Sequence, residues 1–128
     1  MPEKVVIISD KAPKPIGPYS AGIRFGHFVF TAGQIGIDRS AGKLVEGGVE
    51  AQARQAMTNL TYILAEAGTS LDNAVKTTIF LKDMADFAAV NAIYNEFFSG
   101  AFPARSTVQV AALPGGASVE IEVIAAIP

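Results

Sequence analysis

The sequence predicts a single α+β domain, a two-layer sandwich in which two helices pack on one face of a mixed β-sheet. Segments whose apolar residues recur every three or four positions, typical of helices, are interspersed with segments that alternate apolar and polar residues, typical of strands. Two amphipathic helices also need a shared apolar surface, which one face of a sheet provides. The chain of 128 residues has the length of one domain, and no repeat or linker divides residues 1–128.

The first third of the chain is rich in predicted strands. A β-branched segment at residues 4–9 ends at a proline-containing loop. Residues 19–25 and 27–31 predict a hairpin that turns at Gly26. The part of the chain before the first helix is therefore expected to supply two or three strands.

Residues 49–67 predict the first helix. Their apolar residues recur at intervals of three and four and so form one stripe along the helix. Gly68 follows at the position where a glycine commonly ends a helix. The stripe consists of Ala53, Ala56, Met57, Leu60, Ile63, Leu64 and Ala67.

A strand and a second helix follow. Residues 74–82 alternate as a strand does, and Asp83 is expected to cap the helix that comes after it. Gly100 and Pro103 then end the helical region. The side of this helix predicted to be buried carries Phe87, Val90, Tyr94, Phe97 and Phe98.

The next predicted strand begins after Pro103 and carries Arg105 near its start. Counting by two separates a face that bears the guanidinium from a face predicted to belong to the core. The first face holds Arg105, Thr107 and Gln109, and the second holds Ser106, Val108 and Val110.

The chain then turns at residues 114–116, which read Pro-Gly-Gly, and enters a last strand at residues 118–126. Glu120 and Glu122 are two positions apart, so they lie on one face of that strand. The other face is filled by Val119, Ile121 and Val123.

Composition and charge limit the partners and the location. With 50% hydrophobic and only 17% charged residues, the chain is lean in charge for a small domain, which suggests that other subunits cover part of its surface. The net charge of −2 and the scattered Lys and Arg residues disfavour nucleic acid as a partner. The longest apolar run near the start, residues 5–8, is too short for a signal peptide or a membrane span. We therefore expect a cytoplasmic protein without membrane contact.

Several common chemistries have no support in the sequence. There is no cysteine, and the single histidine, His27, has no nearby ligand set or nucleophile motif. The glycine pairs at residues 47–48 and 115–116 lack the spacing of nucleotide-binding loops. No metal and no cofactor are predicted.

Arg105 is the first candidate functional residue, because a guanidinium on a rigid strand offers a flat pair of donors to a carboxylate or phosphate. An ordinary surface ion pair explains it equally well. If the last strand pairs with the Arg105 strand as a hairpin, Glu120 and Glu122 share a face with the arginine. On spacing alone, solvated charges on the outer sheet face are the favoured explanation of the two carboxylates.

Three further residues attract attention at the ends of predicted elements. Tyr19 follows Pro18 and is either a core or turn-packing ring, which sequence alone favours, or an aromatic wall for a small ligand. Gly33 permits the close approach of a backbone or a ligand, or marks a β-bulge. Asn91 lies on the second helix, where an exposed polar face is its ordinary role.

Five motifs in order and spacing resemble the reactive intermediate deaminase A (RidA) family over nearly the whole chain. Each motif alone is weak, and the specificity comes from all of them in register. They are residues 16–19 (IGPY), 31–35 (TAGQI), 90–98 (VNAIYNEFF), 102–106 (FPARS) and 119–122 (VEIE).

The resemblance implies a chorismate-mutase-like α+β fold and a homotrimer with three clefts between neighbouring subunits. It also implies the family activity: hydrolysis of 2-enamine and 2-imine acids, such as 2-aminoacrylate, to 2-keto acids and ammonia without a cofactor. Two alternatives stay open, a non-catalytic trimer that binds small carboxylates or acts as a chaperone, and a less favoured endoribonuclease-like activity.

Carried over residue by residue, the resemblance gives Arg105 the role of clamp on the substrate carboxylate. Glu120 is expected to orient or deprotonate the attacking water. Tyr19 would wall the cleft, Gly33 would present backbone groups to the ligand, and Asn91 matches a motif residue of the site.

The sequence departs from the family pattern at two motif positions. Ala32 stands where many relatives carry serine, which removes a hydroxyl contact. Thr107 stands where many carry cysteine, which removes a reactive thiol. The substrate preference is therefore not determined by the resemblance.

Overall fold

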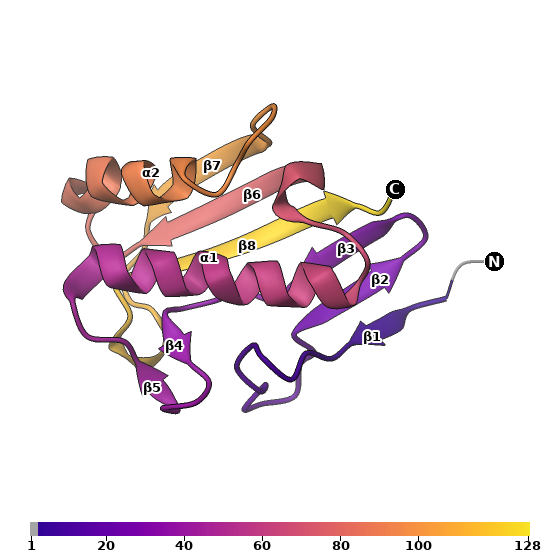
Figure 1. Ribbon diagram of the computed structural model, residues 1–128. Helices are drawn as coiled ribbons and strands as arrows, with labels where there is room; N and C mark the ends of the chain where they lie inside the picture. The colour runs from indigo at the N-terminus through magenta and orange to yellow at the C-terminus, as the bar shows by residue number, and fades with distance from the viewer. Residues whose placement is uncertain (1–2) are drawn as a thin grey trace.

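The computed structural model describes residues 3–128 and consists of two layers (Figure 1). One layer is a sheet of six strands, and the other is formed by α1 (Gly48–Glu66) and α2 (Phe87–Asn95), which lie on the same face of that sheet. The predicted two-layer α+β fold is confirmed.

The strands of the large sheet follow the order β1-β2-β3-β8-β6-β7. All neighbouring pairs are antiparallel except β6 and β7, which are parallel. The bounds are β1 (Val5–Ile7), β2 (Gly22–Phe25), β3 (Phe28–Thr31), β6 (Ala74–Leu81), β7 (Ala104–Gln109) and β8 (Val119–Ala126).

Short elements connect the strands and helices. The sequence did not predict the small hairpin of β4 (Ile37–Asp38) and β5 (Lys43–Leu44), because two-residue strands carry no detectable alternation. Three single-turn 3₁₀ helices complete the chain: η1 (Leu71–Asn73), η2 (Met84–Asp86) and η3 (Pro114–Gly116).

β7 and β8 do not pair as a hairpin, so the arrangement that would have placed Glu120 and Glu122 on the face of Arg105 is not formed. β7 pairs with β6, and β8 lies between β3 and β6. β8 takes a central position in the sheet, and one of its faces is apolar: Val119, Ile121 and Val123 are buried under the helices. β7 is left at the edge, so β6 separates Arg105 from the carboxylates of β8.

The core lies between α1 and the central strands. Every residue of the predicted apolar stripe of α1 is buried. The helix ends as expected, since Gly68 has a positive φ of 82°, and the Thr69 N–H donates to the Leu64 carbonyl at 3.0 Å. This 6→1 hydrogen bond is typical of a glycine-terminated helix.

The start of α2 differs from the prediction. The Asp83 carboxylate caps η2 by accepting a hydrogen bond from the Ala85 N–H at 2.9 Å, and α2 begins only at Phe87. Val90 and Tyr94 are buried as predicted, whereas Phe87 is 36% exposed. The extra 3₁₀ turn leaves Phe87 at the rim of the helix layer instead of in the core.

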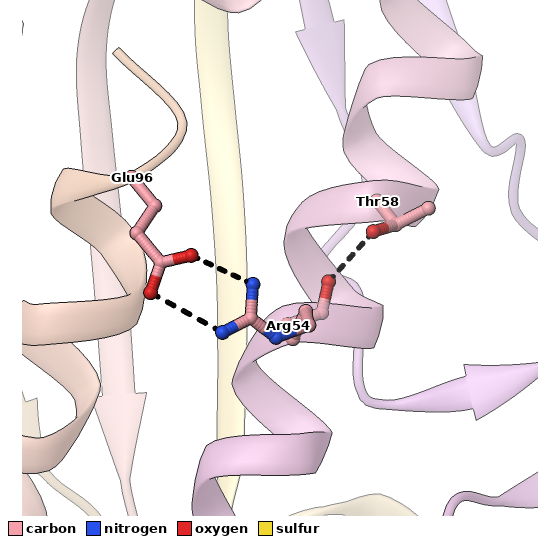
Figure 2. Close-up of polar contacts among 3 residues, drawn as sticks. All are labelled: Arg54, Thr58 and Glu96. Carbon is pink, nitrogen blue, oxygen red and sulfur yellow. Dashed lines mark hydrogen bonds and ion pairs between the residues drawn. The ribbon is translucent and has the colours of Figure 1, made fainter.

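An ion pair joins the two helices on their exposed side (Figure 2). Arg54 of α1 donates to both carboxylate oxygens of Glu96, just after α2, at 2.8 and 3.2 Å. The pair lowers the pKa of Glu96 through this hydrogen bond and the nearby positive charge. Both side chains are about half exposed, so the pair contributes little to the stability of the fold.

Gly68 and Gly100 provide a matched test of the helix end. A Cβ at either position meets no atom within 4 Å, but only Gly68 has a left-handed backbone. Gly68→Ala is therefore expected to lower the free energy of unfolding by about 1–2 kcal/mol, the cost of that conformation for an L residue. Gly100→Ala should leave the free energy unchanged or raise it slightly. Urea unfolding curves measure both, and an equal loss in the two variants would contradict the assignment.

Candidate functional site

The residues suggested by the sequence lie in two separate hollows of the chain. Tyr19, Gly33 and Glu120 line the first, a cavity of about 370 Å³ that is walled by the proline-rich loop after β1. Asn91 and Arg105 line the second, a more open depression at the edge of the sheet beside α2. The structure therefore brings these five residues into two groups.

Gly33 is fixed against the side chain of Glu120. Phe30 pairs with Ile124 of β8, and Gln34 pairs with Ile121. The chain advances four residues between the first two partners but only three between the second two, so the segment has one extra residue and forms a bulge. A Cβ on Gly33 would lie 2.7 Å from the Glu120 Cδ atom. The bulge interpretation of this glycine is therefore confirmed, and the group that approaches it closely is the side chain of Glu120.

Glu120 lies on the sheet face opposite the helices and is half-buried. Burial raises the pKa of its carboxyl, and the nearby charge of Glu122 raises it further. A carboxylate with a raised pKa is a better proton acceptor than an ordinary surface carboxylate. The two glutamates share a face as expected, but Glu120 is not a fully solvated charge.

Tyr19 lies at the rim of the first hollow and is exposed, which excludes the core interpretation. Its N–H donates to the Gly17 carbonyl at 2.8 Å, across a turn centred on Pro18. The ring lies over Gly17, so Tyr19 packs on its own turn while presenting one side to the cavity.

Arg105 lies on the helix side of the sheet. Its register partner on β6 is the buried Thr77, and its guanidinium carbon is 4.9 Å from the ring centroid of Tyr94 and 5.6 Å from that of Phe87. The prediction that the opposite face of β7 belongs to the core is wrong, because Val108 is 43% exposed there. That face of β7 points away from both helices, so neither helix covers it.

Two aromatic rings thus hold the guanidinium of Arg105. The Tyr94 hydroxyl shares a 2.8 Å hydrogen bond with Thr77 Oγ1. Burial raises the pKa of Tyr94, so the ring remains neutral under the cation. Within residues 3–128, Arg105 makes no ion pair, which leaves its donors available to an anion.

Sequence reasoning missed two features near Arg105, one in its hollow and one further along β7. Tyr94 was expected only as a core residue, and its contact with Arg105 depends on the pairing of β7 with β6. Thr107, two positions after Arg105, has a buried Oγ1 without a hydrogen-bond partner in the described part of the chain. The departure from the family pattern at Thr107 was the only signal of this in the sequence.

The two hollows do not meet within one chain. Arg105 lies on the helix side of the edge strand β7, and Glu120 lies on the open face of β8, with β6 between these strands. A ligand of the size of an amino acid therefore cannot contact both side chains of the same chain.

Two kinds of feature are absent from residues 3–128: a group of metal ligands and a membrane-spanning helix. Over residues 3–128, no three His, Cys, Asp or Glu side chains are grouped as a metal site would require. None of the helices in the same range has the length and apolar character needed to cross a membrane.

Comparison with known proteins gives consistent relatives. A family model described as endoribonuclease L-PSP matches residues 9–127. The chain is 52% identical to the mouse protein named 2-iminobutanoate/2-iminopropanoate deaminase over 120 residues, which cover 94% of this chain and 89% of the mouse protein.

Solved structures share the fold over nearly their whole length. YyfA of Yersinia pestis, described as a protein of unknown function of the conserved Rid family, has a TM-score of 0.95 at 49% identity and covers 98% of this chain and 100% of its own. E. coli TdcF, solved with bound serine, has a TM-score of 0.93 at 39% identity, with 98% and 100% covered. Matched from residue 9 to residue 127, the chain belongs to the endoribonuclease L-PSP family, which is the RidA family that its motifs resemble.

Proposed function

We propose that this protein hydrolyses reactive 2-enamine and 2-imine acids, such as 2-aminoacrylate, to 2-keto acids and ammonia. The observation that carries the proposal is the pair of groups described above. Arg105 is a guanidinium that has no ion-pair partner within residues 3–128, and Glu120 is a half-buried carboxylate whose pKa is raised. The mouse relative named as a deaminase of 2-imino acids supports this reaction class.

The substrate carboxylate binds Arg105 through two parallel N–H donors, which the fork of the guanidinium supplies. Tyr94 and Phe87 limit the tilt of that fork. Thr107 lies two residues after Arg105 on the same face of β7, and its Oγ1, without a hydrogen-bond partner among residues 3–128, is a second polar group that we assign to the carboxylate site. The serine bound to TdcF also carries a carboxylate and is of comparable size.

The chemistry requires only water and a base. An enamine substrate first tautomerises to the imine by moving a proton from its nitrogen to C3. Glu120 accepts a proton from a water molecule as the oxygen attacks C2 of the imine, and it passes that proton to the imine nitrogen, which gives a neutral carbinolamine. Glu120 then takes the hydroxyl proton and passes it to the amine nitrogen as the C–N bond breaks, so that ammonia leaves and the 2-keto acid remains. A general base contributes about 10²–10⁴-fold to such a step.

The remaining residues of the first hollow shape the space around this water. Gly33 leaves room for Glu120 and presents its backbone to the cavity, and Tyr19 forms one wall. Asn91 lies with Arg105 in the second hollow and is available to a polar group of the substrate.

We propose that the site is completed between copies of the chain in a homotrimer. Arg105 and Glu120 lie on opposite faces of the sheet, so a shared substrate needs Arg105 of one copy and Glu120 of a neighbour. The face of the sheet that carries Glu120 also exposes large apolar side chains, as expected of a surface that another subunit covers. These include Val6, Phe28, Phe30 and Val108.

The role of Arg105 in binding the substrate carboxylate is tested with an imine that is generated in situ. A serine or threonine dehydratase releases the imine, semicarbazide traps it, and active protein lowers the trapped fraction. Arg105→Ala should lower kcat/KM by about 10²-fold or more, because a desolvated carboxylate loses its charged partner. Arg105→Lys should recover part of the loss, since it keeps the charge but not the fork.

Arg54→Ala is the matched control, because it removes an arginine that is already paired with Glu96 away from both hollows. Its activity should equal that of the wild type. Trapping that is unaffected by the wild-type protein would favour the carboxylate-binding trimer over the enzyme.

The pH dependence tests Glu120 as the base. Only the charged carboxylate accepts a proton, so kcat/KM should rise with pH through the raised pKa of Glu120. Glu122→Gln removes a like charge, which lowers the pKa of Glu120 and should move the acid limb to lower pH. The midpoint of the acid limb should still lie above the ordinary pKa of a glutamate, because burial is the larger cause of the raised pKa. An acid limb that Glu122→Gln leaves in place would contradict the assignment.

Mixed assemblies test whether the site is shared. Arg105→Ala and Glu120→Gln chains are each expected to be inactive alone. Co-expressed in equal amounts, they should regain about a quarter of wild-type activity, because in a cyclic trimer each mixed assembly has one of its three sites intact. Native mass spectrometry identifies the mixed trimers. An inactive mixture that nevertheless contains them would show that both residues act within one chain.

A further inference from the structure

We propose that two buried amide side chains of α1, Gln52 and Asn59, are positioning residues that brace the segments carrying Gly33 and Glu120. The inference rests on the proposed function of that site. Neither side chain lines the first hollow, so any effect on the reaction passes through the backbone of the segments that do.

Asn59 is the first half of the brace. It has no exposed surface, although its neighbours on the buried face of α1 are apolar. Its Nδ2 group donates to the carbonyls of Ile35 and Ile37, at 3.3 and 3.0 Å, and its Oδ1 atom accepts from Gln55 Nε2 at 2.9 Å. One side chain thus holds the segment that directly follows Gly33 and Gln34.

Gln52 is the second half and lies seven residues earlier, on the same face of the helix. Its Oε1 atom accepts a hydrogen bond from the Ser118 N–H at 2.8 Å, two residues before Glu120. Gly36 packs directly on its backbone, since a Cβ there would lie 2.6 Å from the Gln52 Cα atom. Gln52 therefore contacts both segments.

The two braced segments are also joined to each other beside the site. The Gln34 N–H donates to the Ile121 carbonyl at 2.8 Å, and the Ile121 N–H donates to the Gln34 carbonyl at 3.0 Å. Gly33 and Glu120 are the residues immediately before these two. A shift of either segment on α1 therefore changes how Gly33 and the Glu120 carboxylate lie against each other.

Burial makes the brace specific in geometry. A buried amide is costly unless its donors and acceptor are satisfied, whereas an apolar side chain at either position would tolerate several positions of the loop. The hydrogen bonds of Asn59 are all formed only when the carbonyls of Ile35 and Ile37 occupy their present places. The amides thus select one arrangement of the segment.

The variants Asn59→Leu and Gln52→Met keep the approximate size of the side chains and remove these hydrogen bonds. We expect each to lower kcat by about 10-fold or more, because small displacements of a catalytic group cost large factors in rate. KM should change less than threefold, since Arg105 is held separately by α2 and β6. Asn59→Ser, which retains one donor, serves if Asn59→Leu does not fold and should lie between it and the wild type.

Ile63→Val is the matched control. Ile63 is buried on the same helix but packs toward Gly22 of β2, away from both segments. This variant loses core packing without losing a brace hydrogen bond, so it should lower stability and leave kcat unchanged. A kcat loss in Ile63→Val equal to that in Asn59→Leu would reduce the brace to a general stability effect and overturn the proposal.

Amide hydrogen exchange provides a readout that does not need the enzyme reaction. The quantity measured is the exchange rate of the Gln34 and Ile121 amides divided by the rate of core amides in β6. In Asn59→Leu and Gln52→Met this ratio should be at least about 10-fold higher than in Ile63→Val. Unchanged relative exchange would overturn the brace, whatever the activity. If the wild type hydrolyses no imine but exchange increases as expected, the brace stands and the proposed function fails. Faster exchange with an unaltered kcat in an active enzyme would overturn the positioning role.

Discussion

The packing of α1 on β8 is the contact on which the rest of this structure depends. The apolar stripe of the helix covers one face of the strand, where Val119, Ile121 and Val123 are fully buried. A strand cannot slip by one residue without exchanging its two faces, so this burial fixes the register of β8. It consequently places Glu120 and Glu122 on the open face and holds Glu120 against Gly33.

Side chains of the edge strand β7 also alternate between the two faces of the sheet, and this alternation determines where the guanidinium of Arg105 lies. β7 pairs in parallel with β6, and Arg105 stands opposite the buried Thr77. It therefore projects to the helix side, where the end of the sheet is covered by α2 and its aromatic rings. The separation of Arg105 from Glu120 follows from the register of two strands, and the proposed sharing of a site between copies follows from that separation.

Local patterns in the sequence were sufficient for the features that depend on neighbouring residues. The extent of α1, its end at Gly68, the turn at Gly26 and the two faces of β8 each follow from periodicity or from the conformational freedom of glycine. The partner of β7 did not follow, because a short connection through η3 is compatible with a hairpin. Which strand takes the centre depends on competition for the surface of the helices, and that is a property of the whole chain.

The candidate site likewise has features that local sequence patterns predict and features that depend on the whole fold. The motifs identified all five candidate residues, but the two hollows became visible only with the strand order. Asn59 is a polar residue among the apolar positions of α1, and its hydrogen bonds go to carbonyls that lie 22 and 24 residues away. Roles that depend on distant backbone atoms leave no trace in local spacing.

Three polar groups of the candidate site, on Glu120, Thr107 and Arg105, lower the stability of the isolated chain. Burial raises the pKa of Glu120, so the folded chain holds that proton more tightly than the unfolded chain. Stability then falls as pH rises from the ordinary glutamate pKa through the raised one, because the charged carboxylate is the disfavoured form. Among the described residues, the buried hydroxyl of Thr107 has no hydrogen-bond partner, which is a second cost, and Arg105 has no counter-ion. A carboxylate ligand or a neighbouring subunit that satisfied Arg105 and Thr107 would relieve these costs, so binding and assembly should both stabilise the fold.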